Sequence, residues 1–266
     1  MATVKADPGG RGWSLPRVWL ATLTISFIVP AQGLSAEEPK PDPIDYYRAR
    51  YEAARDHYRE RTNDLAASWR LAQATFDLAD NVAESARREE LALEGVRVCR
   101  QVLETHTNSA PAHHFLAMNL GQVARSRPLS ALKIVRQMET AFLQAAALDP
   151  AFDHAGPDRS LGLLYRDAPG WPASIGSRNK ARHHLARAVD LEPDYPENRL
   201  TLAESGVQWK DFALVDRQVG ALRKDLPKAR EILTGPSWGI EWVGWDRRWK
   251  ALLEDHARLR KRAAGF

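Results

Sequence analysis

The sequence predicts an all-α fold: a solenoid of about four helical hairpins, with elongated loops inside the repeats and a C-terminal capping helix. Apolar residues recur at helical spacing from Ile44 onward, and no convincing run of alternating apolar and polar residues appears. A pattern of small and large apolar residues returns 43 positions later, as from Met138 to Ala181. Tryptophans at helical spacing near the C-terminus are typical of a helix that covers the open end of such an array.

The returning pattern has small or apolar residues at offsets 0, 4 and 7 and a proline at offset 12. Its positions are Met138, Phe142, Ala145 and Pro150 in one unit, Ala181, Leu185, Ala188 and Pro193 in the next, and Gly95, Cys99 and Val102 in the unit before. A small residue at each turn lets a second helix approach closely, a larger one fills the groove, and proline stops the helix. These positions are therefore predicted to be structural.

Each of these helices follows another helix with its own signature, which pairs a large apolar residue with Ala or Gly. The four segments are "WRLAQATF" (69–76), "HFLAMNLG" (114–121), "SLGLLYRD" (160–167) and "RLTLAESG" (199–206). Two helices per unit, repeated about four times, predict a helical solenoid.

This pattern, with the turns "ALDPAF" and "DLEPDYPEN", resembles the tetratricopeptide repeat. A standard unit has about 34 residues, whereas the pattern here returns after 43. Because the spacing within the second helix is kept, we expect the additional residues to lie between the two helices of a unit. In the third unit they are "APGWPASIGS" (168–177), and in the second they lie around "RSRPLSALK" (125–133). We expect Ser177 to cap the helix that follows and Trp171 to fold back onto an adjacent helix.

A narrower resemblance rests on "HHFLAMNLGQVAR", on the segment 152–204 with its "LGLLY" and "APG…SIG" motifs, and on the Trp-bearing C-terminus. From about Thr62 to Leu253 the chain resembles the T component of tripartite periplasmic (TRAP) transporters. The resemblance implies a periplasmic, non-enzymatic protein that docks a solute-binding protein, with a small hydrophobic ligand reached through that partner. The chain departs from this family in lacking a lipid-anchor cysteine.

The N-terminus has the pattern of an export signal. Three cations precede the 12-residue apolar segment Val18–Val29, and small residues then allow cleavage after Ala36. The apolar segment is shorter than the ~20 residues of a membrane span, although an uncleaved anchor remains the alternative. No cysteine lies near the cleavage region, so a lipoprotein signal is not expected. The sequence thus predicts an exported protein of the periplasm or cell envelope.

The expected organisation is a signal peptide at 1–36, a Pro-rich tether at 37–43 and the solenoid at 44–266, with the Trp-rich helix from about 237. Tyr47, Tyr51, Ala54 and Tyr58 share one helix face at the start of the solenoid. A stripe of this kind is usually a packing face.

Composition and motifs argue against several other functions. Without residues 1–36 the chain holds 35 basic and 33 acidic residues, too small an excess for a surface that follows nucleic-acid phosphates. The neighbouring histidines at 113–114 and 183–184 point about 100° apart on a helix and cannot chelate a metal as i, i+4 pairs do. No phosphate loop, nucleophile elbow or zinc motif occurs. We therefore predict no catalytic residue, no cofactor and no metal.

Trp238, Trp242, Trp245 and Trp249 fall at i, i+4, i+7 and i+11, which places them on one face of a helix. The pattern favours a cap on the solenoid, and the alternative is a contact with a partner or a membrane interface.

In the repeat type that the sequence resembles, the first helix of each unit lines the concave surface. The positions expected to contact a partner there are Arg70, Asp77, His114, Met118, Arg159, Leu163, Arg166, Leu200 and Glu204. Their mixture of apolar and charged residues suits a protein or amphipathic ligand.

Two functions remain open at this point, and neither involves nucleic acid. The first is a binding module for a periplasmic solute-binding protein, and the second is an envelope scaffold that organises other proteins. An apolar cavity lined by Met118 and Leu163 would favour the first, and a filled groove the second. The chain could also form a homo-oligomer.

Overall fold

The computed structural model describes residues 43–127 and 130–263, and within them the chain is helical, with no β-strand. The helices are α1 (Pro43–Glu60), α2 (Leu65–Asn81), α3 (Ser85–Thr105), α4 (Ala110–Ser126), α5 (Ala131–Leu148), α6 (Phe152–Asp167), α7 (Arg178–Leu191), α8 (Pro196–Gln208), α9 (Phe212–Ile232) and α10 (Pro236–Ala263). The predicted all-α fold is confirmed. No helix in these ranges has both the length and the apolarity needed to cross a bilayer.

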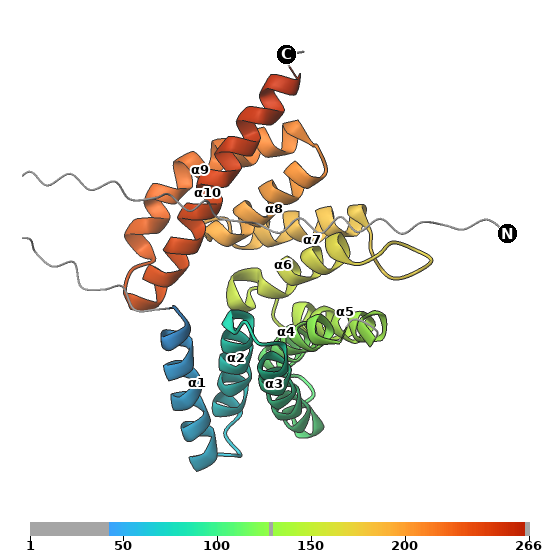
Figure 1. Cartoon of the computed structure of the whole chain (residues 1–266), viewed down its shortest axis with the longest axis vertical. Helices are drawn as coiled ribbons and strands as arrows, with labels where there is room; N and C mark the ends of the chain where they lie inside the picture. The colour runs from blue at the N-terminus through green and yellow to red at the C-terminus, as the bar shows by residue number, and fades with distance from the viewer. Residues whose placement is uncertain (1–42, 128–129, 264–266) are drawn as a thin grey trace, which may run out of the picture. The chain divides into compact units, whose positions relative to one another are not determined.

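Four hairpins follow one another, namely α2 with α3, α4 with α5, α6 with α7 and α8 with α9 (Figure 1). Helix α1 packs on α2, and α10 packs on α8 and α9. Within the described residues, four hairpins are thus present where the sequence predicts about four repeats, preceded by α1 and followed by α10.

The first helices of neighbouring hairpins pack directly on one another, α2 with α4, α4 with α6 and α6 with α8. Each second helix packs against the first helix of its own hairpin and, for α3, α5 and α7, against that of the next one. Because the first helices are the ones in mutual contact, they lie on the inner side of the solenoid. Their exposed side chains form the surface that we call the inner face.

The residues of the repeated pattern hold the hairpins together. Phe142, Ala145, Ala181, Leu185 and Ala188 are buried in the described structure. The reason that small residues are needed is clear at Gly162 of α6, where an added Cβ would lie 2.4 Å from Cγ of Leu185. The predicted structural role of these positions agrees with their burial.

The predicted helix ends also agree with the structure. Helix α5 ends two residues before Pro150, and α7 ends two residues before Pro193, as expected for a residue that cannot continue a helix. At the start of α7, the Ser177 hydroxyl accepts a hydrogen bond from the backbone N–H of Lys180 at 3.3 Å. The predicted N-cap is therefore present.

The loop 168–177 joins the two helices of the third hairpin, where the sequence placed it, but the expectation for Trp171 is wrong. Its side chain is 88% exposed and does not fold onto a helix. The loop is instead closed by its own backbone, since the N–H of Gly176 donates to the carbonyl of Pro169 and that of Ser177 to Tyr165. These backbone hydrogen bonds hold the turn closed without any contact from the Trp171 side chain.

In the second hairpin, the residues in excess of a standard repeat do not form the loop that was expected around 125–133. Helix α4 ends at Ser126 and α5 begins at Ala131, and the two helices have 17 and 18 residues. The additional length of this unit therefore lies in its helices, and an elongated internal loop is found in the third hairpin.

Both end helices pack as the sequence predicts. The tyrosine stripe of α1 lies against α2, with Tyr51 buried and Tyr47, Ala54 and Tyr58 partly buried. In α10, Trp242 and Trp245 are buried in a cluster with residues of α8 and α9, and Trp238 and Trp249 pack at its border. The capping position of α10 is therefore as expected. The predicted signal and nearly all of the tether lie outside the described residues, and the last tether residue, Pro43, is already the first of α1.

We predict that Trp245→Ala destabilises the fold by about 3–5 kcal/mol, because it empties a large buried site. Trp245 is 2% exposed, and its Nε1–H donates to Glu197 Oε2 at 2.8 Å. Trp171→Ala is the matched control and should change the free energy of unfolding by less than about 0.5 kcal/mol. Urea unfolding of both variants is the measurement. Equal losses in the two variants would contradict the placement of both side chains.

Candidate functional site

The inner face carries most of the residues that the sequence assigned to a partner surface. Arg70 is exposed, and Asp77, Met118, Arg159, Leu163, Arg166 and Glu204 are partly exposed. His114 and Leu200 are corrections, because both are wholly buried and present no surface to a partner. Arg70 lies over the ring of Trp69, 5.3 Å from its centroid, and belongs to neither of the two zones described below. The structure divides the other residues between an apolar zone and a charged zone.

The apolar zone is a cleft of about 800 Å³ between α4, α5 and α6, with α2 at its edge. We call it the apolar cleft. Its apolar lining consists of Phe76, Met118, Gly121, Ala124, Ala131, Leu132, Val135, Met138, Phe142, Leu163, Leu164, Ala168 and Pro169. Its volume lies within the range of sites that hold small ligands or the side chains of a partner.

Methionine gives this cleft adaptable walls. Apart from Met1, the chain has two methionines, Met118 and Met138, and both line the cleft. Gly121 keeps the space open, because an added Cβ would lie 3.1 Å from Cε of Met138. Unbranched thioether side chains adjust to differently shaped partners, and surfaces that bind several ligands use them for this reason.

The charges at the rim of the cleft are already paired. Arg125 Nη1 lies 2.6 Å from Asp80 Oδ1, and Arg166 Nε lies 2.7 Å from Asp167 Oδ1. The cleft therefore offers apolar contact without a net charge at its rim, which suits an apolar segment.

The charged zone begins at an irregular turn at the start of α6. Asp153, His154 and Ala155 have positive φ angles of 51°, 53° and 59°, a conformation that costs roughly 1–2 kcal/mol per residue. The turn aims its carbonyl oxygens at neighbouring side chains: the His154 oxygen accepts from Arg159 Nη1 at 3.0 Å and from Asn198 Nδ2 at 3.1 Å. Strain of this kind often accompanies a functional surface.

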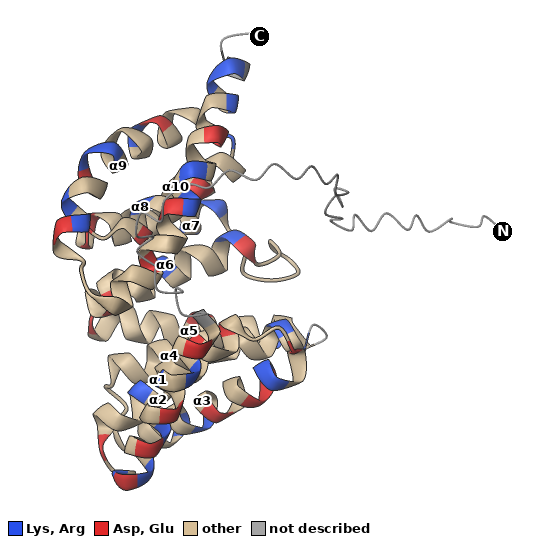
Figure 2. Ribbon diagram, turned by 60° about the vertical axis from the view of Figure 1, so that its left-hand side comes forward, with Lys and Arg blue, Asp and Glu red and all other residues tan. Residues whose placement is uncertain are grey.

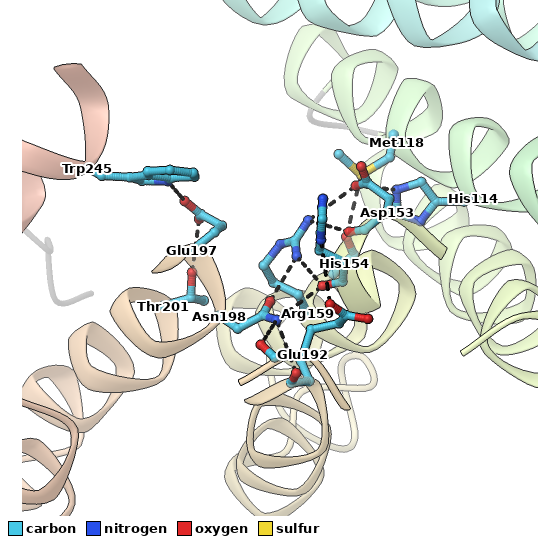
Figure 3. Close-up of polar contacts among 12 residues, drawn as sticks. His114, Met118, Asp153, His154, Arg159, Glu192, Glu197, Asn198, Thr201 and Trp245 are labelled. Carbon is cyan, nitrogen blue, oxygen red and sulfur yellow. Dashed lines mark hydrogen bonds and ion pairs between the residues drawn. The ribbon is translucent and has the colours of Figure 1, made fainter. Parts of the chain in front are cut away.

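Around this turn, five helices place charged side chains next to one another (Figure 3 shows those of α6 and α8). We call this group the acidic recess. Its carboxylates are Asp77 of α2, Asp153 of α6, Glu197 and Glu204 of α8 and Glu241 of α10, and its guanidiniums are Arg50 of α1, Arg159 of α6 and Arg248 of α10. Nη1 of Arg50 lies 3.2 Å from Oδ2 of Asp77, and Nη2 of Arg159 lies 3.2 Å from Oδ2 of Asp153.

The carboxylates of the recess differ in how readily they ionise. Burial opposes the ionisation of Glu197, but the guanidinium of Arg248 outweighs it and lowers the pKa of that carboxyl, whereas the pKa values of Asp77 and Glu241 are raised. Burial raises the pKa of Asp77 to about 7; Arg50 opposes this shift, and the charges of Asp153 and Glu241 add to it. Desolvation by the surrounding protein also raises the pKa of Glu241, and the charges of Glu197 and Asp153 raise it further. The recess therefore holds more negative charge than its own arginines balance.

His114 lies behind Asp153, enclosed by aromatic rings. Its ring centroid is 5.1 Å from that of Phe115 and 5.5 Å from those of Phe142 and Phe152. Neither ring nitrogen forms a hydrogen bond within the described residues, and Nε2 lies 3.8 Å from Oδ2 of Asp153. Burial lowers the pKa of His114 to about 4, although the charge of Asp153 opposes the shift. The histidine is therefore neutral at neutral pH.

At the last hairpin the chain covers its own inner face with α10. Arg248 Nη1 lies 2.5 Å from Glu197 Oε2, Arg248 Nε lies 2.8 Å from Glu204 Oε1, and Leu200 is buried in the cluster beneath the helix. Glu204 thus contacts α10, which corrects the expectation that it faces a free groove. The open part of the inner face belongs to the first three hairpins.

Several residues of the site escaped the sequence analysis. Glu241 and Arg248 lie on the helix that was predicted only as a cap, and Leu132 lies in the segment expected to be a loop. Met138 could have been assigned to the site from the sequence. Apart from Met1, it and Met118 are the two methionines of the chain, and each lies at a repeat position. Within the described ranges, no group of three or more His, Cys, Asp or Glu side chains is arranged to hold a metal ion.

Comparisons with known proteins support the fold. The crystal structure of TTC0263, a thermophilic TPR protein of Thermus thermophilus, matches with a TM-score of 0.60 and 18% identity, over 79% of this chain and 92% of that one. This likeness shows that the chain has a tetratricopeptide-type fold. Residues 42–153 match the family model described as regulator of microtubule dynamics protein 1-3. This is a different family from the TRAP T component, and no curated protein matches the chain.

The raised pKa of Asp77 predicts a pH-dependent cost to stability. Because its carboxyl binds a proton more tightly in the folded than in the unfolded chain, stability falls as pH rises from about 4 to about 7. Asp77→Asn should remove this cost and stabilise the protein more at pH 8 than at pH 4. Thermal unfolding of the variant and the parent at both pH values measures the difference.

The control is Asp190→Asn, at an exposed aspartate of α7. It should leave the difference between the two pH values unchanged. An Asp77→Asn variant that loses more stability at pH 8 than at pH 4 would contradict the placement of Asp77 in a crowded acidic site.

Proposed function

We propose that this protein is a non-enzymatic protein-binding module whose inner face receives an apolar segment of a partner in the apolar cleft. The tetratricopeptide-type fold is typical of scaffolds and of protein–protein interaction. The observation that carries the proposal is the cleft itself, an apolar space of about 800 Å³ between α4, α5 and α6 to which Met118 and Leu163 of the inner face contribute. Buried apolar contacts of this kind supply most of the affinity at protein interfaces.

The form of the cleft favours a segment with several apolar side chains along one side. Its long walls are helices α4, α5 and α6, and an amphipathic helix presents apolar residues at i, i+3, i+4 and i+7 to such a groove. The paired charges of the rim, Asp80 with Arg125 and Asp167 with Arg166, leave the centre free for this contact.

For the identity of the partner we propose an exported solute-binding protein of the tripartite transporter type. Three sequence features support this: the export-type N-terminus, the "LGLLY" and "APG…SIG" motifs, and the scarcity of catalytic motifs. The match to the microtubule-dynamics family covers residues 42–153 and so spans α1 to the turn at the start of α6.

The alternative is an envelope scaffold that organises other proteins without handling a ligand. An open apolar cleft lined by Met118 and Leu163 supports the first proposal over this one, because a scaffold has no need for an unfilled apolar site. A small hydrophobic ligand of the partner would find a compatible surface there.

We predict that Leu132→Arg abolishes binding of an apolar segment, because it places a charge on the wall of the cleft. The probe is a fluorescein-labelled amphipathic peptide of about 16 Leu, Ala and Gln residues, long enough to form a helix. Fluorescence anisotropy should show binding to the parent and a loss of at least about tenfold in the variant, equivalent to about 1.4 kcal/mol.

Leu143→Arg is a closely matched control. Leu132 and Leu143 lie on the same helix and are 47% and 42% exposed, but only Leu132 lines the cleft. Equal losses in both variants, or no binding to the parent, would overturn the proposal. The same pair of variants identifies natural partners: a solute-binding protein should co-purify from cell-envelope extract with Leu143→Arg but not with Leu132→Arg.

A further inference from the structure

We propose that the acidic recess binds lysine or arginine side chains of the partner, so that the inner face selects an apolar segment flanked by cationic residues. This inference rests on the proposed function, because it specifies the charge of the segment that enters the neighbouring cleft.

The charge balance of the recess is the first argument. Arg248 already pairs with Glu197 and Glu204, so the part of the recess open to a partner holds the carboxylates of Asp77, Asp153 and Glu241 against the guanidiniums of Arg50 and Arg159. Glu241 is exposed at the surface, and it lies near enough to Asp77 for its charge to raise the pKa of that carboxyl. A cationic side chain that enters beside Glu241 and Asp77 would meet carboxylates that lack sufficient counter-charge.

The recess also carries an internal electrostatic cost that a cation would relieve. Burial and the charges of Asp153 and Glu241 hold the pKa of Asp77 at about 7, so this carboxyl is partly protonated at neutral pH. A bound ammonium or guanidinium lowers that pKa, because an opposite charge nearby favours the ionised form. Binding therefore releases a proton from the recess.

His114 supplies an independent observation. Its ring is wholly buried behind Asp153, both of its nitrogens lack hydrogen-bond partners among the described residues, and Nε2 faces the Asp153 carboxylate at 3.8 Å (Figure 3). A buried polar group without a partner lowers the stability of the folded chain, because it has given up its hydrogen bonds to water. The His114–Asp153 pair thus remains incompletely satisfied in the unliganded chain, at the base of the recess.

Aromatic rings border the recess and suit a cation. The guanidinium of Arg159 lies 5.4 Å from the ring centroid of Tyr195, and Trp238 is 6.3 Å from Tyr195 and only partly buried. Lysine and arginine are attracted to such ring faces. Because His154 stacks on Tyr195 with ring centroids 4.2 Å apart and Arg159 lies over the same ring, the partly buried Trp238 is the aromatic surface that remains for an incoming cation.

The apolar cleft and the acidic recess adjoin each other on the same helices. On α2, Phe76 and Asp80 line the cleft, while Asp77 belongs to the recess. On α6, Arg159 belongs to the recess and the next residue, Ser160, lines the cleft, where its hydroxyl contacts Met118 Sδ at 3.6 Å. One continuous segment can therefore reach both zones.

The test compares three labelled peptides with the same apolar core: a neutral one, one with three lysines at one end and one with three glutamates there. We expect the lysine peptide to bind the full protein about tenfold more tightly than the neutral peptide, a difference of about 1.4 kcal/mol. This advantage should shrink when the salt concentration rises, because salt screens exposed charges. The glutamate peptide should bind more weakly than the neutral one.

The variant Asp77→Asn/Glu241→Gln should reduce the lysine advantage, measured as the ratio of the two peptides' Kd values on the same variant, to less than about threefold, or about 0.7 kcal/mol. The matched control is Asp190→Asn/Glu231→Gln, at two exposed acidic residues of α7 and α9, which should keep the full advantage. Circular dichroism of each variant verifies that its helices are intact.

The outcomes separate this inference from the proposed function. Equal binding of lysine and glutamate peptides, or equal losses in the two double variants, overturns the acidic recess as a cation site. Binding of the neutral peptide in that case leaves the proposed function intact. If instead only the lysine peptide binds, and Leu132→Arg has no effect on it, the cleft fails and the recess stands.

Discussion

The close approach of paired helices at glycine and alanine positions is the constraint on which the rest of the structure depends. At Gly95 of α3, an added Cβ would lie 2.4 Å from Thr75 Oγ1 and 2.5 Å from the Asn119 side chain. The contact lets Asn119 donate to the carbonyl of Ala72 at 2.8 Å and so joins α2, α3 and α4. Because each hairpin fixes the next in this way, side chains of α2, α4 and α6 meet on one surface.

Charge is distributed differently on the outer helices and on the inner face. Along α9, five basic residues are interspersed with three acidic ones (Figure 2). Such mixed surfaces keep a protein soluble and give little specificity. On the inner face, by contrast, helices distant in sequence bring carboxylates together, as Asp77 of α2 and Glu241 of α10 show. Specific recognition is therefore expected from the inner face.

Much of the fold could be predicted from the sequence because helix pairing follows local patterns. The spacing of Phe142, Ala145, Leu185 and Ala188 requires a neighbouring helix at each turn, and these residues are buried accordingly. The position of Trp171 could not be predicted in this way. Whether a loop tryptophan is buried depends on the backbone hydrogen bonds of the loop, which leave no pattern in the sequence.

The site was predictable only in part. Helical spacing indicates which face of a helix a residue lies on, but it does not indicate which other element packs over that face. Met118, Leu163, Asp77 and Arg159 lie on the inner face as expected. His114 is buried because aromatic rings from α4, α5 and α6 enclose it. The recess could not be derived at all, because it requires the position of α10 relative to α2.

The contact of Arg248 with Glu197 and Glu204 means that a partner would have to compete with α10 for these two carboxylates. Since α10 belongs to the same chain, its guanidinium is held near these carboxylates at an effective concentration of the order of millimolar or more. A partner present at micromolar concentration cannot displace it unless its affinity for that position is much higher. The last hairpin is thereby closed to exchange, and α10 determines how far along the solenoid a bound segment can extend.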